Sequence, residues 1–140
     1  MTTRVLFVCV SNRGKSVMAE GLARLGAYGA IEASSAGTQA AVGGTVNELS
    51  AQVLAEVGGD ISNHQPRQLT NDMMTTADLV IAVGTAAQID APTGTVVEVW
   101  DTDEPSLRGF DGLDRMRLIR NDIAARVDDL AHRLTHEQSR

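Results

Sequence analysis

The feature of this sequence that most limits its fold is a set of four short apolar segments, separated by stretches with helical periodicity. The segments contain mainly Val, Ile, Leu and Ala, and they span residues 5–9, 31–33, 79–83 and 96–100. Short apolar runs of this kind are typical of strands that are buried on both faces. Strands that alternate with helices form right-handed crossover units, which build a parallel sheet. The sequence therefore predicts an α/β fold, in which four parallel strands carry helices on both faces, as a single domain over residues 1–140.

Three helical segments are expected between and after these strands. The first spans residues 17–27 and the second spans residues 47–57, where Asn47 is expected to cap the helix and two glycines follow its end. The third has apolar residues at steps of three and four, which form one continuous stripe: Leu113, Met116, Ile119, Ile123, Val127, Leu130 and Leu134. Such a stripe predicts a long helix that packs on the sheet.

Cys9 is the single cysteine of the chain, and it ends the first apolar segment. A loop of small and polar residues follows it and leads into the first helix: Val10, Ser11, Asn12, Arg13, Gly14, Lys15 and Ser16. In such a loop the backbone N–H groups point inward in front of a helix N-terminus, an arrangement that binds a tetrahedral oxyanion and favours a thiolate. The spacing therefore predicts a nucleophile and an oxyanion-binding loop at one place, beyond the carboxyl end of a strand.

Individual residues of this loop suggest how it is built. Gly14 can take the positive φ that wraps a loop around an anion, and Asn12 is one of the few other residues that tolerate it. Ser16 has two possible roles, as the cap of the following helix or as a hydroxyl turned toward Cys9 to stabilise the thiolate. The alternative for the cysteine is a small buried apolar residue, which the run of small and polar residues after it argues against. Residues 37–46 either border this site or form a plain surface connection.

A second candidate segment, residues 100–109, carries three carboxylates directly before Pro105. Cleavage of an oxygen from a tetrahedral oxyanion needs a proton for the departing group, which a loop carboxylic acid can supply. Crowding of Asp101, Asp103 and Glu104 is expected to raise the pKa of at least one of them. The sequence leaves open whether Asp103 or Glu104 is the acid, and the alternative to both is a solvated acidic turn.

Charge and composition argue against several classes of function. A formal net charge of −6 argues against a nucleic-acid partner, so the anion site must be a local positive spot on an acidic protein. No secretory leader and no run of transmembrane length is found, and a lone reactive thiol suits a reducing compartment, so we expect a cytoplasmic protein without a membrane partner. His132 and His136 are one helical turn apart, but no third ligand is evident and no metal site is predicted.

Residues 5–16 have the sequence VLFVCVSNRGKS and are followed by Met18, Ala19 and Glu20. This segment resembles the phosphate loop of the low-molecular-weight tyrosine phosphatase superfamily and, within it, of the arsenate reductases. Other segments resemble the family's second-strand signature, middle turn, third strand, acid loop and last helix: residues 35–38, 60–66, 77–81, 103–105 and 119–123. The resemblance covers nearly the whole chain and implies the fold of that superfamily.

One position departs from the family pattern, because Lys15 stands where the family has arginine. A guanidinium binds two oxygens of an oxyanion at once, whereas an ammonium is a compact point charge. We therefore expect weaker oxyanion binding unless Arg13 or the backbone compensates, although Arg13 taken alone is more typical of a solvent-facing loop charge. The ending Gly14, Lys15, Ser16 resembles that of a branch of actinobacterial arsenate reductases, so we interpret the lysine as a variant of a working site.

The resemblance implies arsenate reduction rather than phosphotyrosine hydrolysis. Superfamily members that act on phosphotyrosine have aromatic residues just after the acid loop, where this chain has Ser106, Leu107 and Arg108. With one Tyr, two Phe and one Trp in the chain, a slot for a phenyl ring is hard to build. Arsenate is small and wholly polar and needs no such slot.

The implied reaction is attack of Cys9 on arsenate held by the loop N–H groups and Lys15, with Asp103 or Glu104 protonating the departing hydroxyl. Thioredoxin-coupled members pass the oxidation to two further cysteines, which this chain lacks. An external thiol is therefore implied, namely mycothiol with a mycoredoxin-like glutaredoxin as partner, or glutathione instead, and no bound cofactor. The chain would then serve arsenate detoxification as an arsenate-mycothiol transferase. A low-molecular-weight protein tyrosine phosphatase and a non-catalytic oxyanion-binding module remain as alternatives.

Overall fold

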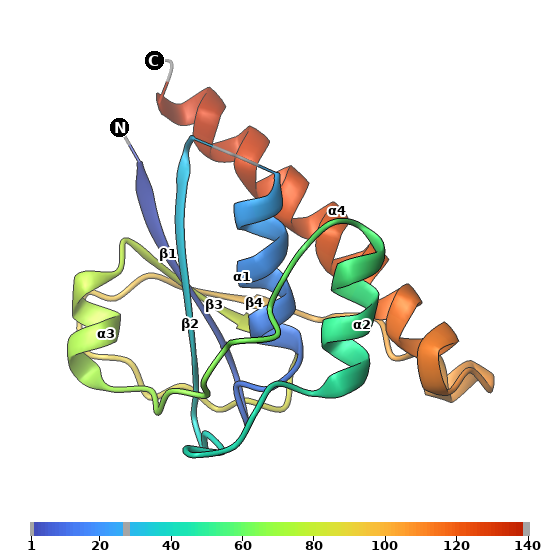
Figure 1. The fold of residues 1–140 in the computed structure, drawn as a ribbon. Coiled ribbons are helices and arrows are strands. Elements are labelled where there is room, and N and C mark those ends of the chain that lie inside the picture. The colour runs from blue at the N-terminus through green and yellow to red at the C-terminus, as the bar shows by residue number, and fades with distance from the viewer. Residues whose placement is uncertain (1, 27–28, 139–140) are drawn as a thin grey trace.

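A parallel sheet forms the centre of the protein in the computed structural model, which describes residues 2–26 and 29–138 (Figure 1). Within these residues the sheet has four strands: β1 (Thr3–Cys9), β2 (Ile31–Gly37), β3 (Leu79–Val83) and β4 (Val97–Trp100). The helices are α1 (Lys15–Leu25), α2 (Glu48–Glu56), α3 (Asn71–Thr76), the short 3₁₀ helix η1 (Pro105–Arg108) and α4 (Gly112–Gln138).

The strands lie in the order β2-β1-β3-β4, and all neighbouring pairs are parallel. Phe7 of β1 is paired with Ser35 of β2 on one side and with Ile81 of β3 on the other. Because the strands run in the same direction, their carboxyl ends meet at one edge of the sheet. The loop after Cys9 and the loop after Trp100 therefore open on the same edge, with the end of β3 between them.

Helices cover both faces of the sheet, as the sequence predicts. Figure 1 shows α1, α2 and α4 on one side of the sheet and α3 on the other. On the first side, Val5, Phe7 and Ile81 are buried against these three helices, and the rings of Phe7 and Trp100 are 5.7 Å apart. On the second side, a smaller apolar cluster contains Leu6, Val8, Ala36, Met74 and Val80. The two clusters cover the two faces of the same sheet, so the chain forms a single α/β domain.

The long helices match the predicted positions closely. The side chain of Asn47 accepts a hydrogen bond of 3.0 Å from the N–H of Ser50, which is the predicted cap of α2. The apolar stripe of α4 faces the sheet, and its middle members are fully buried: Ile119, Ile123, Val127 and Leu130. In the described part of the chain, no helix combines the length and apolar character that crossing a membrane requires.

The prediction for the first helix was wrong at its start. α1 begins at Lys15, two residues before the predicted residue 17, and its first backbone bond runs from the N–H of Met18 to the carbonyl of Gly14 at 2.9 Å. The polar residues at this end carry no apolar periodicity, so the pattern placed them in the loop. The predicted end of this helix, Ala27, lies outside the described residues.

Strand β2 is longer than predicted, and two short helices were not predicted at all. β2 continues through Ser34, Ser35 and Ala36 to Gly37, because each of these residues keeps its pairing with β1. Ser35 is fully buried although it is polar, so a search for apolar runs ends too early. The helices α3 and η1 have six and four residues, which is too short for a helical period to be recognised.

Candidate active site

Cys9 is the last residue of β1 and is partly exposed. The backbone N–H of Asn12 donates to Cys9 Sγ at 3.3 Å, and Ser16 Oγ lies 2.9 Å from the same sulfur. The loop of residues 10–14 thus curls around the thiol, and α1 begins directly behind it. The structure brings together the sulfur, the loop and the helix N-terminus that the sequence predicts.

Asn12, and not Gly14, supplies the left-handed turn of the loop. Asn12 has φ +59° and is the only residue other than glycine with positive φ in the described part of the chain, whereas Gly14 has φ −131°. The expectation for Gly14 was therefore wrong. A side chain in this conformation costs about 1 kcal/mol, so the asparagine must be held in place by its surroundings. It is fully buried and hydrogen-bonded on both sides.

The backbone N–H of Arg67 fixes the orientation of the Asn12 amide, because an N–H can only donate and so must face the amide oxygen. The backbone N–H of Arg67 donates to Asn12 Oδ1 at 2.9 Å, and His64 Nε2 lies 3.0 Å from the same oxygen. The other end of the amide must then carry the nitrogen, which donates to Ser16 Oγ at 2.9 Å and to Ser35 Oγ at 3.0 Å. Burial is the main cause of the lowered pKa of His64, so its ring is neutral at pH 7. Its Nε2 faces two oxygens of Asn12, the backbone carbonyl and Oδ1, so Nε2 carries the proton.

These directions fix the protons around the sulfur. Ser35 Oγ accepts from Asn12 and donates to Glu20 Oε1 at 2.5 Å, while Glu20 forms an ion pair of 2.6 Å with Arg24. Ser16 Oγ likewise accepts from Asn12, so its hydroxyl proton is free to point at Cys9. The sulfur then receives two hydrogen bonds, one from a hydroxyl and one from a backbone N–H.

Of the two roles left open for Ser16, the structure supports the contact with the sulfur. Ser16 is the second residue of α1 and is fully buried, and the residue at the cap position, Gly14, makes no side-chain cap.

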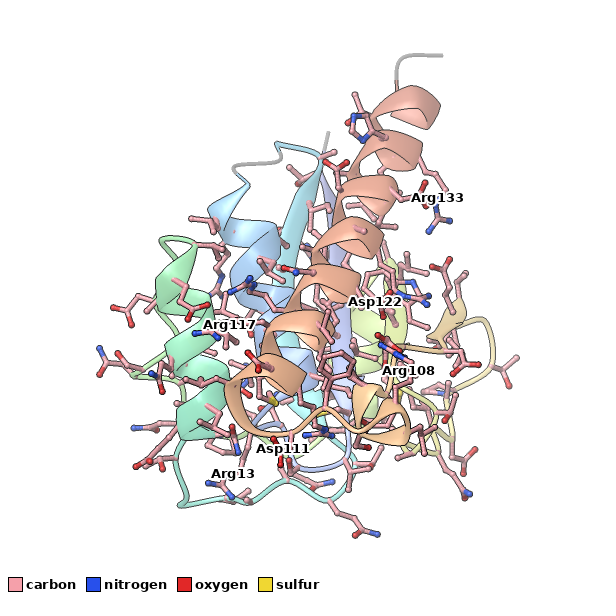
Figure 2. The ribbon with its side chains drawn as sticks, turned by 90° about the vertical axis from the view of Figure 1, so that its right-hand side faces the viewer. Arg13, Arg108, Asp111, Arg117, Asp122 and Arg133 are labelled. Atoms are coloured by element: carbon pink, nitrogen blue, oxygen red, sulfur yellow. The ribbon has the colours of Figure 1, made fainter. Side chains whose placement is uncertain are left out.

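Of the two interpretations of residues 37–46, the structure supports the one in which they border the loop of residues 9–16, called the phosphate loop below, and the contacts extend to Asn47. Backbone N–H groups along this segment donate to carbonyls of the phosphate loop: Thr38 to Cys9 at 2.9 Å, Gln39 to Val10 at 2.8 Å, Ala41 to Ser11 at 3.1 Å, and Asn47 to Arg13 at 2.8 Å. The side chain of Arg13 reinforces this border, because its Nε donates to the carbonyl of Thr45 at 2.6 Å. Figure 2 shows Arg13 among the loops at the lower end of the molecule, and the residue is half-buried rather than fully exposed to solvent.

The side chain of Lys15 leaves the phosphate loop and contacts the acid loop. Its Nζ donates to Thr102 Oγ1 at 2.9 Å, and Thr102 follows the end of β4. Lys15 also lowers the pKa of Asp103 electrostatically, although Arg108 is the main cause of that shift. The positive charge of Lys15 therefore lies between the two loops that the sequence assigned to chemistry.

Both candidate acids are held in ion pairs, so the expectation of a raised pKa was wrong for each of them. Arg108 donates to both oxygens of Asp103 at 2.7 and 2.9 Å and holds the pKa of that carboxyl below its usual value. Arg115 donates to both oxygens of Glu104 at 3.0 and 2.7 Å and lowers the pKa of Glu104 to about 2. Opposite charges outweigh the mutual repulsion of the carboxylates.

Helix α4 fixes the backbone of the acid loop. Asp122 accepts a hydrogen bond of 2.8 Å from the N–H of Asp103, and Arg126 donates to the carbonyl of Asp101 at 2.7 Å. Figure 2 shows Asp122 on α4 and Arg108 below it on the acid loop. Asp101 therefore contributes its carbonyl to the anchoring of the loop, and the loop is set against one helix face.

Several residues of this site were not among the predicted ones. Four of them support the phosphate loop from other segments, and the fifth belongs to the acid loop and binds Lys15: Glu20, Ser35, His64 and Arg67, and Thr102. The only available signal for them was positional, since Glu20, Ser35 and His64 lie in segments that resemble signatures of the superfamily. No apolar or charge pattern marks Thr102.

Known proteins are similar to this chain in sequence. The family described as low molecular weight phosphotyrosine protein phosphatase matches residues 4–140. Arsenate reductase 1 of Staphylococcus epidermidis is 29% identical over 133 residues, which cover 93% of this chain and 96% of the relative.

Solved structures agree with this assignment. The structure of a thioredoxin-dependent arsenate reductase from Corynebacterium glutamicum has a TM-score of 0.77 and 28% identity, and the similarity covers 97% of this chain and 63% of that one. An arginine phosphatase, YwlE from Geobacillus stearothermophilus, has a TM-score of 0.77 and 26% identity, covering 97% of this chain and 95% of that one. With its phosphate loop and acid loop at one edge of a parallel sheet, the chain belongs to the low molecular weight phosphotyrosine protein phosphatase family and is an enzyme of that family.

Proposed function

We propose that this protein is an arsenate reductase that transfers arsenate to a low-molecular-weight thiol through Cys9. The observation that carries the proposal is the sulfur of the partly exposed Cys9, which accepts hydrogen bonds from Ser16 and Asn12 inside the curled loop of residues 10–16. A relative and a solved structure named as arsenate reductases support the choice of oxyanion. Such chemistry needs a reducing environment, so we place the protein in the cytoplasm.

In the first step the Cys9 thiolate attacks the arsenic of arsenate. The loop N–H groups of residues 10–16 and the Lys15 ammonium bind the oxyanion, and a hydroxyl leaves as water once it has received a proton. A sulfur–arsenic bond forms and an arsenic–oxygen bond breaks, so arsenic remains pentavalent. The adduct is a thioarsenate on Cys9.

Asp103 is the better candidate for the proton donor. Glu104 is held by Arg115 and caps η1 by accepting from the N–H of Ser106 at 3.4 Å, so its carboxylate already serves the loop. Arg108 is the main cause of the lowered pKa of Asp103, and the charge of Lys15 adds to it, so Asp103 is the carboxylate that senses the lysine of the phosphate loop. Its pair with Arg108 keeps it ionised at rest, and the negative charge of bound arsenate would raise its pKa toward the value that proton donation needs.

The electrons must come from thiols outside the chain, because Cys9 is its only cysteine. An external thiolate attacks the arsenic of the adduct, which releases Cys9 and leaves arsenic pentavalent on the second thiol. A redoxin thiolate then attacks the sulfur of that second thiol, a disulfide forms between the two, and the electron pair of the sulfur–arsenic bond reduces arsenic to arsenite. The resemblance to actinobacterial reductases favours mycothiol and a mycoredoxin-like glutaredoxin, with glutathione as the alternative.

Hydrolysis of a phosphate ester is the second candidate, because the same loop would bind a phosphoryl group and YwlE is named an arginine phosphatase. The acid loop offers little to hold an aryl substrate. Leu107 is 86% exposed and aliphatic, and the ring of Phe110 lies under the guanidinium of Arg108 at 5.9 Å. A member that acts on phosphotyrosine would need an aromatic slot here.

One set of assays tests the proposal. The purified protein is incubated with arsenate and either mycothiol or glutathione, the matching redoxin is added, and arsenite is measured. We expect arsenite with mycothiol and mycoredoxin, and none from Cys9→Ser. Turnover of p-nitrophenyl phosphate much faster than arsenate reduction would make the protein a phosphatase. Oxyanion binding without product under either thiol would make it a binding module.

A further inference from the structure

The ammonium of Lys15 is held by residues that the sequence does not connect with it. Its Nζ donates to Thr102 Oγ1 at 2.9 Å, across 87 positions of the chain, and the Thr102 side chain is buried. On another side lies Gly84, the residue after β3, where an added Cβ would be 3.4 Å from Nζ and 3.5 Å from Cδ of Lys15. The end of the lysine side chain therefore lies in a slot between the ends of β3 and β4.

This slot matters because an ammonium lacks the orientation of a guanidinium. The planar fork of arginine aims two N–H groups at two oxygens of an oxyanion, and part of its order is built in. Lysine has three N–H groups on a flexible stem, so its charge is free to move away from the anion. A single fixed acceptor at the right place would remove much of that freedom.

We propose that Thr102 is a positioning residue for Lys15. The hydroxyl oxygen of Thr102 accepts a hydrogen bond from one N–H of the ammonium, and this turns the other two N–H groups toward the oxyanion bound by the phosphate loop. Lys15 and Thr102 together then do what one arginine does in the family pattern. The inference rests on the proposed function only in requiring that the loop binds a tetrahedral oxyanion. It does not depend on which thiol or redoxin follows.

The competing explanation is that the contact merely fastens the acid loop to the phosphate loop. In that case its loss would weaken both loops whatever residue stands at position 15. Under our proposal its loss matters only while position 15 is a lysine, because a guanidinium or an uncharged chain gains nothing from being aimed by Thr102. The two explanations therefore differ in a double-mutant cycle.

The test uses two variants. Thr102→Val keeps the shape of the side chain but removes the hydroxyl acceptor, and Thr102→Ser keeps the hydroxyl acceptor. Inorganic phosphate is the probe, and its dissociation constant is measured by calorimetry and by protection of Cys9 from iodoacetamide. We expect Thr102→Val to weaken phosphate binding about tenfold, as the loss of a hydrogen bond to a charged group does. Thr102→Ser should restore binding to within about twofold, and in turnover assays Thr102→Val should raise KM more than it lowers kcat.

Two further backgrounds make the result decisive. In Lys15→Arg and in Lys15→Met we expect Thr102→Val to change phosphate affinity by less than about twofold. The inference would be overturned if Thr102→Val weakened phosphate binding equally in all three backgrounds, or if it did not weaken phosphate binding when position 15 is the native lysine. Thermal unfolding of each variant identifies any that do not fold, and the Lys15→Arg pair, which does not need the lysine contact, then carries the comparison.

The inference and the proposed function fail separately. If the native protein reduces arsenate and binds phosphate but Thr102→Val binds it equally well, only the role of Thr102 is lost. If the native protein binds neither phosphate nor arsenate, the oxyanion site itself is refuted and the role of Thr102 with it.

Discussion

The phosphate loop, residues 9–16, and the acid loop, residues 101–109, lie at the same edge of the sheet but are held in opposite ways. The phosphate loop is fixed by short hydrogen bonds that converge on Asn12, a residue with no exposed surface. The acid loop is fixed by arginine–carboxylate pairs whose side chains are between about one third and one half exposed to solvent, as for Asp103 at 31% and Arg108 at 52%.

This difference separates a rigid part of the site from an adjustable one. Buried hydrogen bonds between neutral groups are little affected by salt, and they leave costly unpaired groups when broken. Exposed ion pairs are screened by salt and contribute little to stability. We therefore expect the nucleophile to stay in place under conditions that release the carboxyl groups of the acid loop.

The largest effect should come from removing the Asn12 side chain. Asn12→Ala leaves the Arg67 N–H without its acceptor, removes the donor to the hydroxyl oxygens of Ser16 and Ser35, and places an alanine in the left-handed region. We expect the free energy of unfolding to fall by about 3 kcal/mol, measured by urea denaturation, and iodoacetamide alkylation of Cys9 at pH 7 to slow about tenfold.

Asn12→Gly is the matched control for the backbone. It loses the same four hydrogen bonds but accepts positive φ without strain, so it should recover about 1 kcal/mol relative to alanine. If both variants stay within about 0.5 kcal/mol of the native protein, the buried network does not hold the loop.

The same contrast explains how far the sequence could be interpreted. Apolar periodicity and residues within one segment indicate the strands, the long helices and the phosphate loop, so their positions were predicted within a few residues. The network around Asn12 could not be predicted, because its partners Ser35 and Arg67 lie 23 and 55 positions away. Such bonds depend on which loops the sheet brings together.

The charge state of the acid loop was predicted with the wrong sign for a different reason. Crowding of Asp101, Asp103 and Glu104 is visible in the sequence, and repulsion alone would raise a pKa. The compensating cations, Arg108 and Arg115, are also close in sequence, at five and eleven positions from their partners. Only the turn made by η1 and the start of α4 shows that they fold back onto the carboxylates.

A moderate effect is expected when the cation beside Asp103 is removed. Arg108 is the largest cause of the lowered pKa of Asp103, so Arg108→Gln should raise that pKa toward its usual value. A proton donor acts only while protonated, so the falling limb of the arsenate-reduction pH profile should move to higher pH, with about a threefold gain at pH 7.5. Arg108→Lys keeps the charge and should show a smaller shift.

Salt gives an independent test of the same pair. Raising the ionic strength should shift the profile of the native protein in the direction of Arg108→Gln, with little further shift in that variant. Alkylation of Cys9 by uncharged iodoacetamide should not respond to salt. A profile that is unchanged by Arg108→Gln would exclude Asp103 as the acid controlled by this arginine.

The smallest effect should come from the second ion pair of the acid loop. Arg115 lowers the pKa of Glu104 to about 2, from an ordinary value near 4.5. The pair therefore stabilises the fold above pH 4.5, and its contribution is lost as the pH falls from 4.5 to 2. Both side chains are about one third exposed, so solvent screening limits the contribution to about 1 kcal/mol.

Glu104→Gln should lose that amount at pH 7 and show a shallower fall of unfolding free energy between pH 4.5 and pH 2, measured by urea denaturation. Asp114→Asn, which removes a more exposed carboxylate on α4, is the matched control and should leave the slope unchanged. An equally steep fall in Glu104→Gln would mean that other carboxylates cause the acid sensitivity and that the acid loop is not held by this pair.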